Sequence, residues 1–80
     1  MGVKPIPLAT FEKFLRKEGL VRVRTKGSHD IYEYADPNKK LSRPITVKNN
    51  LKDVPITHIH TNLDSLGISK KDFTKKIKDL

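Results

Sequence analysis

The chain has 80 residues, of which 35% are hydrophobic and 32% charged, and it contains no cysteine. These values predict one small domain with a limited core, and they exclude disulfides and thiolate chemistry. No apolar run approaches the roughly 20 residues that a membrane-spanning helix needs. The N-terminus shows no apolar signal segment, so we expect a cytoplasmic protein.

The charge of the chain is strongly positive. It has 17 Lys and Arg residues against 9 Asp and Glu, which gives a formal net charge of +8. Such a charge predicts a polyanionic partner, with nucleic acid ahead of an acidic protein or an anionic membrane. The alternative is a lysine-rich surface that only keeps the protein in solution. The aromatic content of 6% argues against a broad platform for stacking single-stranded bases.

The chain is predicted to begin with an extended lead-in over residues 1–9, which contains two prolines. A helix follows, for which Thr10 is the expected N-cap and Gly19 suits the residue after the end. The apolar stripe of this helix consists of Phe11, Phe14 and Leu15.

Three strands are predicted next. Residues 20–25 alternate, with Val21 and Val23 between arginines, which indicates a half-buried strand. Residues 28–34 are rich in strand-forming side chains, and residues 43–48 alternate again. The sequence Asp36-Pro37-Asn38 between the last two is typical of a turn.

A polar connection over residues 49–55 leads to a second helix, residues 56–66, which Gly67 ends. Ser69 is the expected N-cap of a short last helix. The inward side chains of these two helices are Ile56, Ile59, Leu63, Leu66, Phe73, Ile77 and Leu80. This element order predicts an α+β two-layer domain, with a three-stranded antiparallel sheet and the helices on one face.

The segment Lys26-Gly27-Ser28-His29 is the compact cluster of reactive groups in the sequence. Gly27 allows a sharp turn and a close approach of an RNA backbone. Lys26 can pair with a phosphate and Ser28 can donate a hydrogen bond to it. Arg24, on the preceding strand, is a further candidate for phosphate contact. His29 is then the candidate acid or base, the alternative being a surface histidine at the start of a strand.

Strand parity gives His29 an expected face. His29, Ile31 and Glu33 should share one side of their strand, with Asp30 and Tyr32 on the other. A bulge at the glycine would change this parity.

Two other features have competing interpretations. His58 and His60 lie about 200° apart on a helix and cannot chelate one ion well, so we expect no metal site. The last helix is crowded with cations, which complement the helix dipole or hold phosphates or an acidic partner. These cations are Lys70, Lys71, Lys75, Lys76 and Lys78. The sequence shows no phosphate-binding loop, zinc-ligand spacing or serine triad.

The order of elements, with Lys26-Gly27-Ser28-His29 opening the second strand and Tyr32 three residues on, resembles the HicA family of bacterial toxins. The resemblance extends from about Thr10 to Phe73 and includes the Asp36-Pro37 turn. Its other segments are Phe11 to Gly19, Pro44-Ile45-Thr46-Val47 and Leu66-Gly67-Ile68-Ser69. The chain departs from the family at residues 54–60 and in its lysine-rich last helix.

The resemblance implies a fold like that of double-stranded-RNA-binding domains and the activity of an mRNA interferase, which cuts translated transcripts without a metal or other cofactor. It implies a HicB-like antitoxin that covers the active histidine, and a monomer when the toxin is free. His29 matches the catalytic histidine of the family. Gly27 and Ser28 match its neighbours, and Lys26 the basic residue before them.

The sequence therefore favours a HicA-like endoribonuclease in which His29 acts as general acid or base while Lys26, Ser28 and Arg24 hold the phosphate. The motif contains one histidine, so a second acid or base is unassigned. The alternatives are a non-catalytic double-stranded-RNA-binding module of the same fold and a protein-interaction domain whose lysine-rich tail docks an acidic partner.

Overall fold

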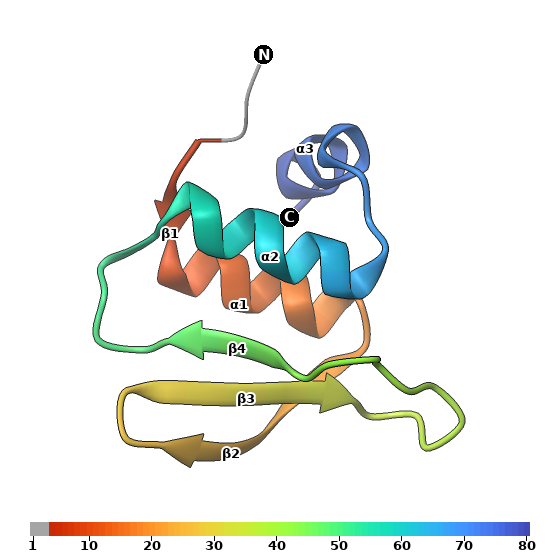
Figure 1. The fold of residues 1–80 in the computed structure, drawn as a ribbon. Coiled ribbons are helices and arrows are strands. Elements are labelled where there is room, and N and C mark those ends of the chain that lie inside the picture. Colours follow the sequence, from red (N-terminus) through yellow and green to blue (C-terminus); the bar gives the residue numbers. More distant parts are fainter. Residues whose placement is uncertain (1–3) are drawn as a thin grey trace.

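A computed structural model describes residues 4–80, and it confirms the predicted α+β class with a three-stranded antiparallel sheet (Figure 1). The described elements are β1 (Ile6–Pro7), α1 (Leu8–Lys17), β2 (Leu20–Lys26), β3 (His29–Tyr34), β4 (Ile45–Lys48), β5 (Asp53–Val54), α2 (Ile56–Leu66) and α3 (Lys70–Lys78). The bounds of β2, β3 and β4 differ from the prediction by one or two residues. The predicted turn after β3 is present, because the Asn38 amide donates to the Asp36 carboxylate at 2.9 Å.

The main sheet is antiparallel with the order β2-β3-β4, so β3 is central and β4 is an edge. Helices α1 and α2 both lie on one face of this sheet, and α3 lies beyond them, on the side of the helices away from the sheet (Figure 1). The other face of the sheet has no helix over it in the described part of the chain (Figure 1). We call it the open face.

A second, two-stranded sheet was not predicted. Ile6 and Pro7 of β1 pair with Val54 and Asp53 of β5. The expected lead-in is thus extended but paired from Ile6, and residues 1–3 of that prediction lie outside the described part. The polar connection before α2 likewise contains a short strand. This pairing brings the start of α1 next to the start of α2.

The prediction that Thr10 caps α1 is wrong. The helix begins at Leu8, and Pro7 occupies the N-cap position without a side-chain hydrogen bond. The Leu8 amide donates instead to the carbonyl of Lys52, with an N–O distance of 3.0 Å. A backbone carbonyl brought close by the β1–β5 pairing thus satisfies the first amide of the helix, which has no partner within the helix.

The prediction that Val21 and Val23 form the buried face of β2 is also wrong. Val21 and Val23 are 42% and 49% exposed. Leu20 and Arg22 point toward the helices, since their partners in β3, Tyr34 and Tyr32, do so. The register shifts between Arg22 and Arg24, which leaves Val23 as the bulge residue of an edge strand.

Aromatic side chains pack between the first helix, α1, and the last, α3. Phe11 and Phe14 of α1 are fully buried, as predicted, and Phe73 of α3 is 2% exposed. The rings of Phe14 and Phe73 meet edge to face with centroids 4.8 Å apart, a favourable geometry for an aromatic pair. The core therefore continues through the helices into α3.

Helix α2 packs through its predicted apolar positions, with one exception. Ile59 and Leu63 are buried and Leu66 is partly buried against the core. Ile56 was expected to face inward but is 37% exposed. It is the first residue of the helix, where the β5–α2 connection holds it at the edge of the core.

The predicted end of α2 and the predicted start of α3 are confirmed. Gly67 ends α2 in the left-handed conformation, with φ of 71°. The Ser69 hydroxyl accepts a hydrogen bond from the amide of Asp72 at 3.1 Å, as an N-cap should. Within residues 4–80, none of the helices is both long and apolar enough to cross a membrane.

We expect Phe73→Ala to lower the free energy of unfolding by about 3–5 kcal/mol, because it removes a ring from a closely packed core. Denaturant unfolding followed by circular dichroism measures the change. Ile77→Ala is the matched control, because Ile77 lies one turn away on α3 but is only partly buried. A loss at Ile77 equal to that at Phe73 would contradict the proposed role of the aromatic contact.

Candidate functional site

The segment Lys26-Gly27-Ser28-His29 forms the tight turn between β2 and β3. Lys26 pairs directly with His29, so Gly27 and Ser28 are the two turn residues. Gly27 has φ of 60°, whereas Ser28 does not have positive φ. A glycine at the first central position is the requirement of a type II′ hairpin turn. Gly27 therefore has a structural reason to be glycine, and the turn sets Lys26 beside His29.

A row of three basic side chains crosses the open face. His29 pairs with Lys26 of β2 on one side and with Lys48 of β4 on the other. Directly paired residues of an antiparallel sheet point to the same face. We call Lys26, His29 and Lys48 the basic row. His29 and Lys26 are exposed and Lys48 is half-buried.

The predicted face of His29 is confirmed. Asp30 and Tyr32 are buried under the helices, and His29 and Glu33 are exposed on the other side of β3. The bulge that could have reversed this parity occurs at Val23, beyond the turn, and not at Gly27.

The other two predicted phosphate contacts, Arg24 and Ser28, lie outside the basic row. Arg24 pairs with Ile31 and therefore lies on the open face, two residues or roughly 7 Å along the strand from Lys26. Ser28 is half-buried in the turn, and its carbonyl accepts a hydrogen bond from the Asn49 amide at 2.7 Å. The sequence missed Lys48, because only the pairing of β3 with β4 brings it next to His29.

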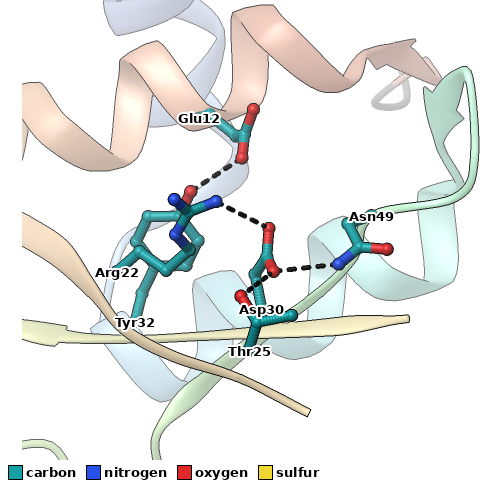
Figure 2. Close-up of polar contacts among 6 residues, drawn as sticks. All are labelled: Glu12, Arg22, Thr25, Asp30, Tyr32 and Asn49. Carbon is teal, nitrogen blue, oxygen red and sulfur yellow. Dashed lines mark hydrogen bonds and ion pairs between the residues drawn. The ribbon is translucent and has the colours of Figure 1, made fainter. Parts of the chain in front are cut away.

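Behind the basic row, on the helix side of the sheet, lies a buried carboxylate (Figure 2). Asp30 is 3% exposed. Its Oδ1 accepts hydrogen bonds from the Thr25 hydroxyl at 2.7 Å and from Asn49 Nδ2 at 2.9 Å. Its Oδ2 lies 3.7 Å from Arg22 Nη1, in an ion pair whose arginine is mostly exposed. Asp30 thus joins groups from β2, β3 and the residue that follows β4.

These contacts determine the charge of Asp30. The hydrogen bonds from Asn49 and Thr25 hold the pKa of the Asp30 carboxyl below its ordinary value, against the opposing effect of burial, and Arg22 adds to the lowering. A carboxylate that accepts hydrogen bonds is favoured in its charged form. Asp30 is therefore a buried anion at neutral pH.

A second, partly buried hydrogen bond connects the sheet to α1 (Figure 2). The Tyr32 hydroxyl donates a hydrogen bond to Glu12 Oε2 at 2.8 Å. Burial, together with this hydrogen bond and the charge of Glu12, raises the pKa of Tyr32 well above its usual value. Tyr32 is thus a neutral structural donor in β3, on the side away from the basic row.

A groove borders the basic row between β4 and α2, with a volume of about 340 Å³. Its walls come from the sheet on one side and from a single stripe of α2 on the other. The lining residues are His29, Arg43, Pro44, Thr46, Lys48, His58, Thr61, Asn62 and Ser65. The sequence did not reveal this groove, because its two walls are separated along the chain.

The α2 wall follows helical spacing. His58, Thr61, Asn62 and Ser65 lie at intervals of three and four residues, beside the buried stripe of the same helix. Asn62 is 5% exposed, and its Nδ2 donates to the backbone carbonyl of Thr46 at 3.2 Å. This bond connects α2 to the edge strand β4 and fixes the orientation of the polar stripe.

The two histidines of α2 separate as predicted. His58 lines the groove, whereas His60 does not line it and has a buried Nε2 atom without a hydrogen-bond partner. Among residues 4–80, no group of three or more His, Cys, Asp or Glu side chains is arranged to hold a metal ion.

The lysine-rich helix forms a different surface. Helix α3 contacts α1 and α2 and lies on their side away from the sheet (Figure 1). Lys76 Nζ lies 3.1 Å from Glu18 Oε2, so this lysine connects α3 to the end of α1. The five predicted cations of α3 are thus not part of the basic row.

The arrangement around His29 suits a phosphodiester. Two ammonium groups flank an exposed imidazole on a face without a helix over it, and a polar groove begins beside it. Lysines can hold a phosphate as point charges. An imidazole can move a proton near neutral pH.

Comparisons with known proteins give no further assignment. No family model, no curated protein and no solved structure matches this chain.

We expect the protein to lose stability in acid through Asp30. The pKa of this group is lower in the folded than in the unfolded state, so the unfolded state takes up the proton first. The stabilisation is complete at neutral pH, and it declines as the pH falls below about 3.9, the ordinary value of an aspartate, through the lower folded value. Denaturant unfolding at a series of pH values measures this.

Asp30→Asn is the matched variant, since it keeps the shape of the side chain and removes the titration. Its unfolding free energy should be lower at pH 7 and should depend less on pH below about 4. Parallel pH profiles of the two proteins would contradict the assignment.

Proposed function

We propose that this protein is a HicA-like endoribonuclease that cuts mRNA without a metal, with His29 as general acid or base. The basic row carries the proposal: an exposed imidazole lies between Lys26 and Lys48 on the open face. The order α1-β2-β3-β4-α2 is consistent with a double-stranded-RNA-binding-domain-like fold, which is part of the same proposal.

The chemistry follows from the substrate. RNA carries a 2′-hydroxyl that can attack the adjacent phosphorus once its proton is removed. The charge that develops on the phosphate oxygens is stabilised by Lys26 and Lys48, and removing such a stabilising group costs about 3–4 kcal/mol in other enzymes. Arg24 lies on the same face and holds a neighbouring phosphate. Ser28, in the turn, contributes a hydrogen bond to the phosphate that His29 acts on.

The partner in this proposal is a HicB-like antitoxin that covers the open face. Such a protein would neutralise the toxin by occluding His29, which is exposed in the free chain. The free toxin acts as a monomer. Whether the neighbouring gene encodes a HicB-like protein is a direct check on this partner.

We expect His29→Ala to reduce the rate of RNA cleavage by a factor of about 10²–10⁴, since this is the usual contribution of a positioned acid or base. The measurement uses purified protein and mRNA in the presence of EDTA, with growth arrest on expression as a second measurement. His60→Ala is the matched control, because it also removes a histidine but lies outside the groove.

Equal cleavage and equal toxicity of the wild type and His29→Ala would refute the catalytic assignment. Salt-sensitive binding of duplex RNA that stays intact after long incubation would instead support a non-catalytic RNA-binding module.

The basic row also predicts how binding depends on salt. Lys48→Ala, made in the His29→Ala background to prevent cleavage, should weaken RNA binding regardless of base sequence. The negative slope of log affinity against log salt should become less steep by about one, because one phosphate contact is lost. Lys71→Ala on α3 is the control and should leave the slope unchanged. The reverse result would place the RNA on the lysine-rich helix.

A further inference from the structure

Cleavage of RNA by its own 2′-hydroxyl needs two proton transfers. One group removes the proton from the 2′-oxygen, and another donates a proton to the 5′-oxygen that leaves. Attack and departure occur on opposite sides of the phosphorus, so two groups on two sides of the phosphate are required. His29 supplies one of them under the proposed function.

His58 is placed to be the other. It lines, from α2, the groove that His29 lines from β3. The two histidines therefore border one space from two elements that are distant in sequence. His60 is the third histidine of the chain, and it lies outside this groove.

The position of His58 is fixed by contacts on the same helix. Asn62 follows His58 by one helical turn, or about 6 Å along the axis, and donates to the carbonyl of Thr46 in β4. Ile59 and Leu63 are buried beside this stripe. Because α2 is held both by its core face and by this bond, His58 stays on the wall of the groove.

The groups around His58 suit an RNA strand. The described lining residues include Arg43 and Lys48 as cations and contain no carboxylate. Thr46, Thr61 and Ser65 add hydroxyl groups to the lining. The Thr61 and Ser65 hydroxyls donate to the carbonyls of Thr57 and Thr61, at 3.0 and 3.3 Å, so toward a ligand they are acceptors. An RNA backbone can use both kinds of group, the cations for its phosphates and the acceptors for its 2′-hydroxyls.

We infer that the RNA strand is cut at the mouth of the β4–α2 groove, with the scissile phosphate between His29 and His58, and that His58 is the second proton-transfer group. This inference rests on the proposed function. It assigns the group that the turn motif leaves open, and it places the RNA next to the strand edge as well as on the open face.

The reaction balances with these two residues. One imidazole takes the proton of the 2′-hydroxyl, and the resulting oxygen forms a bond to phosphorus. The bond from phosphorus to the 5′-oxygen breaks, and that oxygen takes a proton from the other imidazole in its protonated form. The products are a 2′,3′-cyclic phosphate and a free 5′-hydroxyl, so neither an oxidant nor a metal ion takes part.

The test compares four single variants with the wild-type protein on one mRNA-derived oligonucleotide. His29→Ala and His58→Ala should each slow cleavage by a factor of about 10²–10⁴, and the control His60→Ala should not. His58→Gln should be as slow as His58→Ala, since glutamine keeps a hydrogen-bonding side chain but cannot relay a proton. Thermal melting confirms that each variant is folded.

A second substrate tests proton transfer directly. Sulfur replaces the bridging 5′-oxygen at the cleaved bond, and the thiolate leaves without protonation. One of the two histidine variants, the one that lacks the general acid, should recover most of the wild-type rate on this RNA, while the other stays slow. The pH profile of the wild type on ordinary RNA should be bell-shaped, and each variant should lose one limb.

The possible failures are distinguishable. Wild-type cleavage with an inactive His29→Ala and an unchanged His58→Ala would overturn the role of His58 and leave the proposed function intact. Normal activity of His58→Gln would reduce His58 to a structural residue. A single-limbed wild-type profile would also overturn the inference, even if the His58 variants did not fold. Absence of cleavage by the wild type would refute the proposed function itself.

Discussion

The candidate site depends on the hydrogen bonds that the buried carboxylate of Asp30 accepts. This carboxylate accepts hydrogen bonds from Thr25 and Asn49, at 2.7 and 2.9 Å. Each of these three residues is the chain neighbour of one member of the basic row: Thr25 of Lys26, Asp30 of His29 and Asn49 of Lys48. Neighbouring residues of a strand point to opposite faces. The network on the helix side therefore fixes the positions of the cations on the open face without occupying that face.

The groove depends on a second constraint, at the other side of β4. An edge strand leaves backbone groups without sheet partners. At Thr46 such a carbonyl accepts a hydrogen bond from Asn62, and this bond sets the distance between β4 and α2. Because Asn62 is 5% exposed, losing the bond would leave its side-chain amide buried without this partner. The same contact that satisfies the strand edge thus keeps a polar stripe, His58 included, opposite the sheet.

Local patterns were sufficient for the parts of the site that follow chain periodicity. The face of His29 followed from strand parity, and the Ser69 cap from its residue type and position. The features that sequence missed depend on contacts between distant segments. Lys48 reaches His29 only through the β3–β4 register, and His58 reaches the groove only through the packing of α2. The predicted burial of Val21 and Val23 was wrong because valines in an edge strand with one uncovered face need not be buried. The expected cap at Thr10 was wrong because the helix begins two residues earlier, at Leu8, whose amide donates to the Lys52 carbonyl.

The repulsion between the lysines of the basic row lowers stability only slightly, and their attraction for a bound anion is larger. Lys26 and Lys48 are separated by β3, so their strands are roughly 10 Å apart. Two unit charges at that distance repel by about 0.4 kcal/mol in water. A phosphate over His29 would lie about 5 Å from each lysine position, where each attraction is about 0.8 kcal/mol in water and more where water is displaced. The two attractions together exceed the repulsion about fourfold by the same law. The charges of the basic row therefore oppose the fold only slightly, and they favour an anion over His29 by a larger amount.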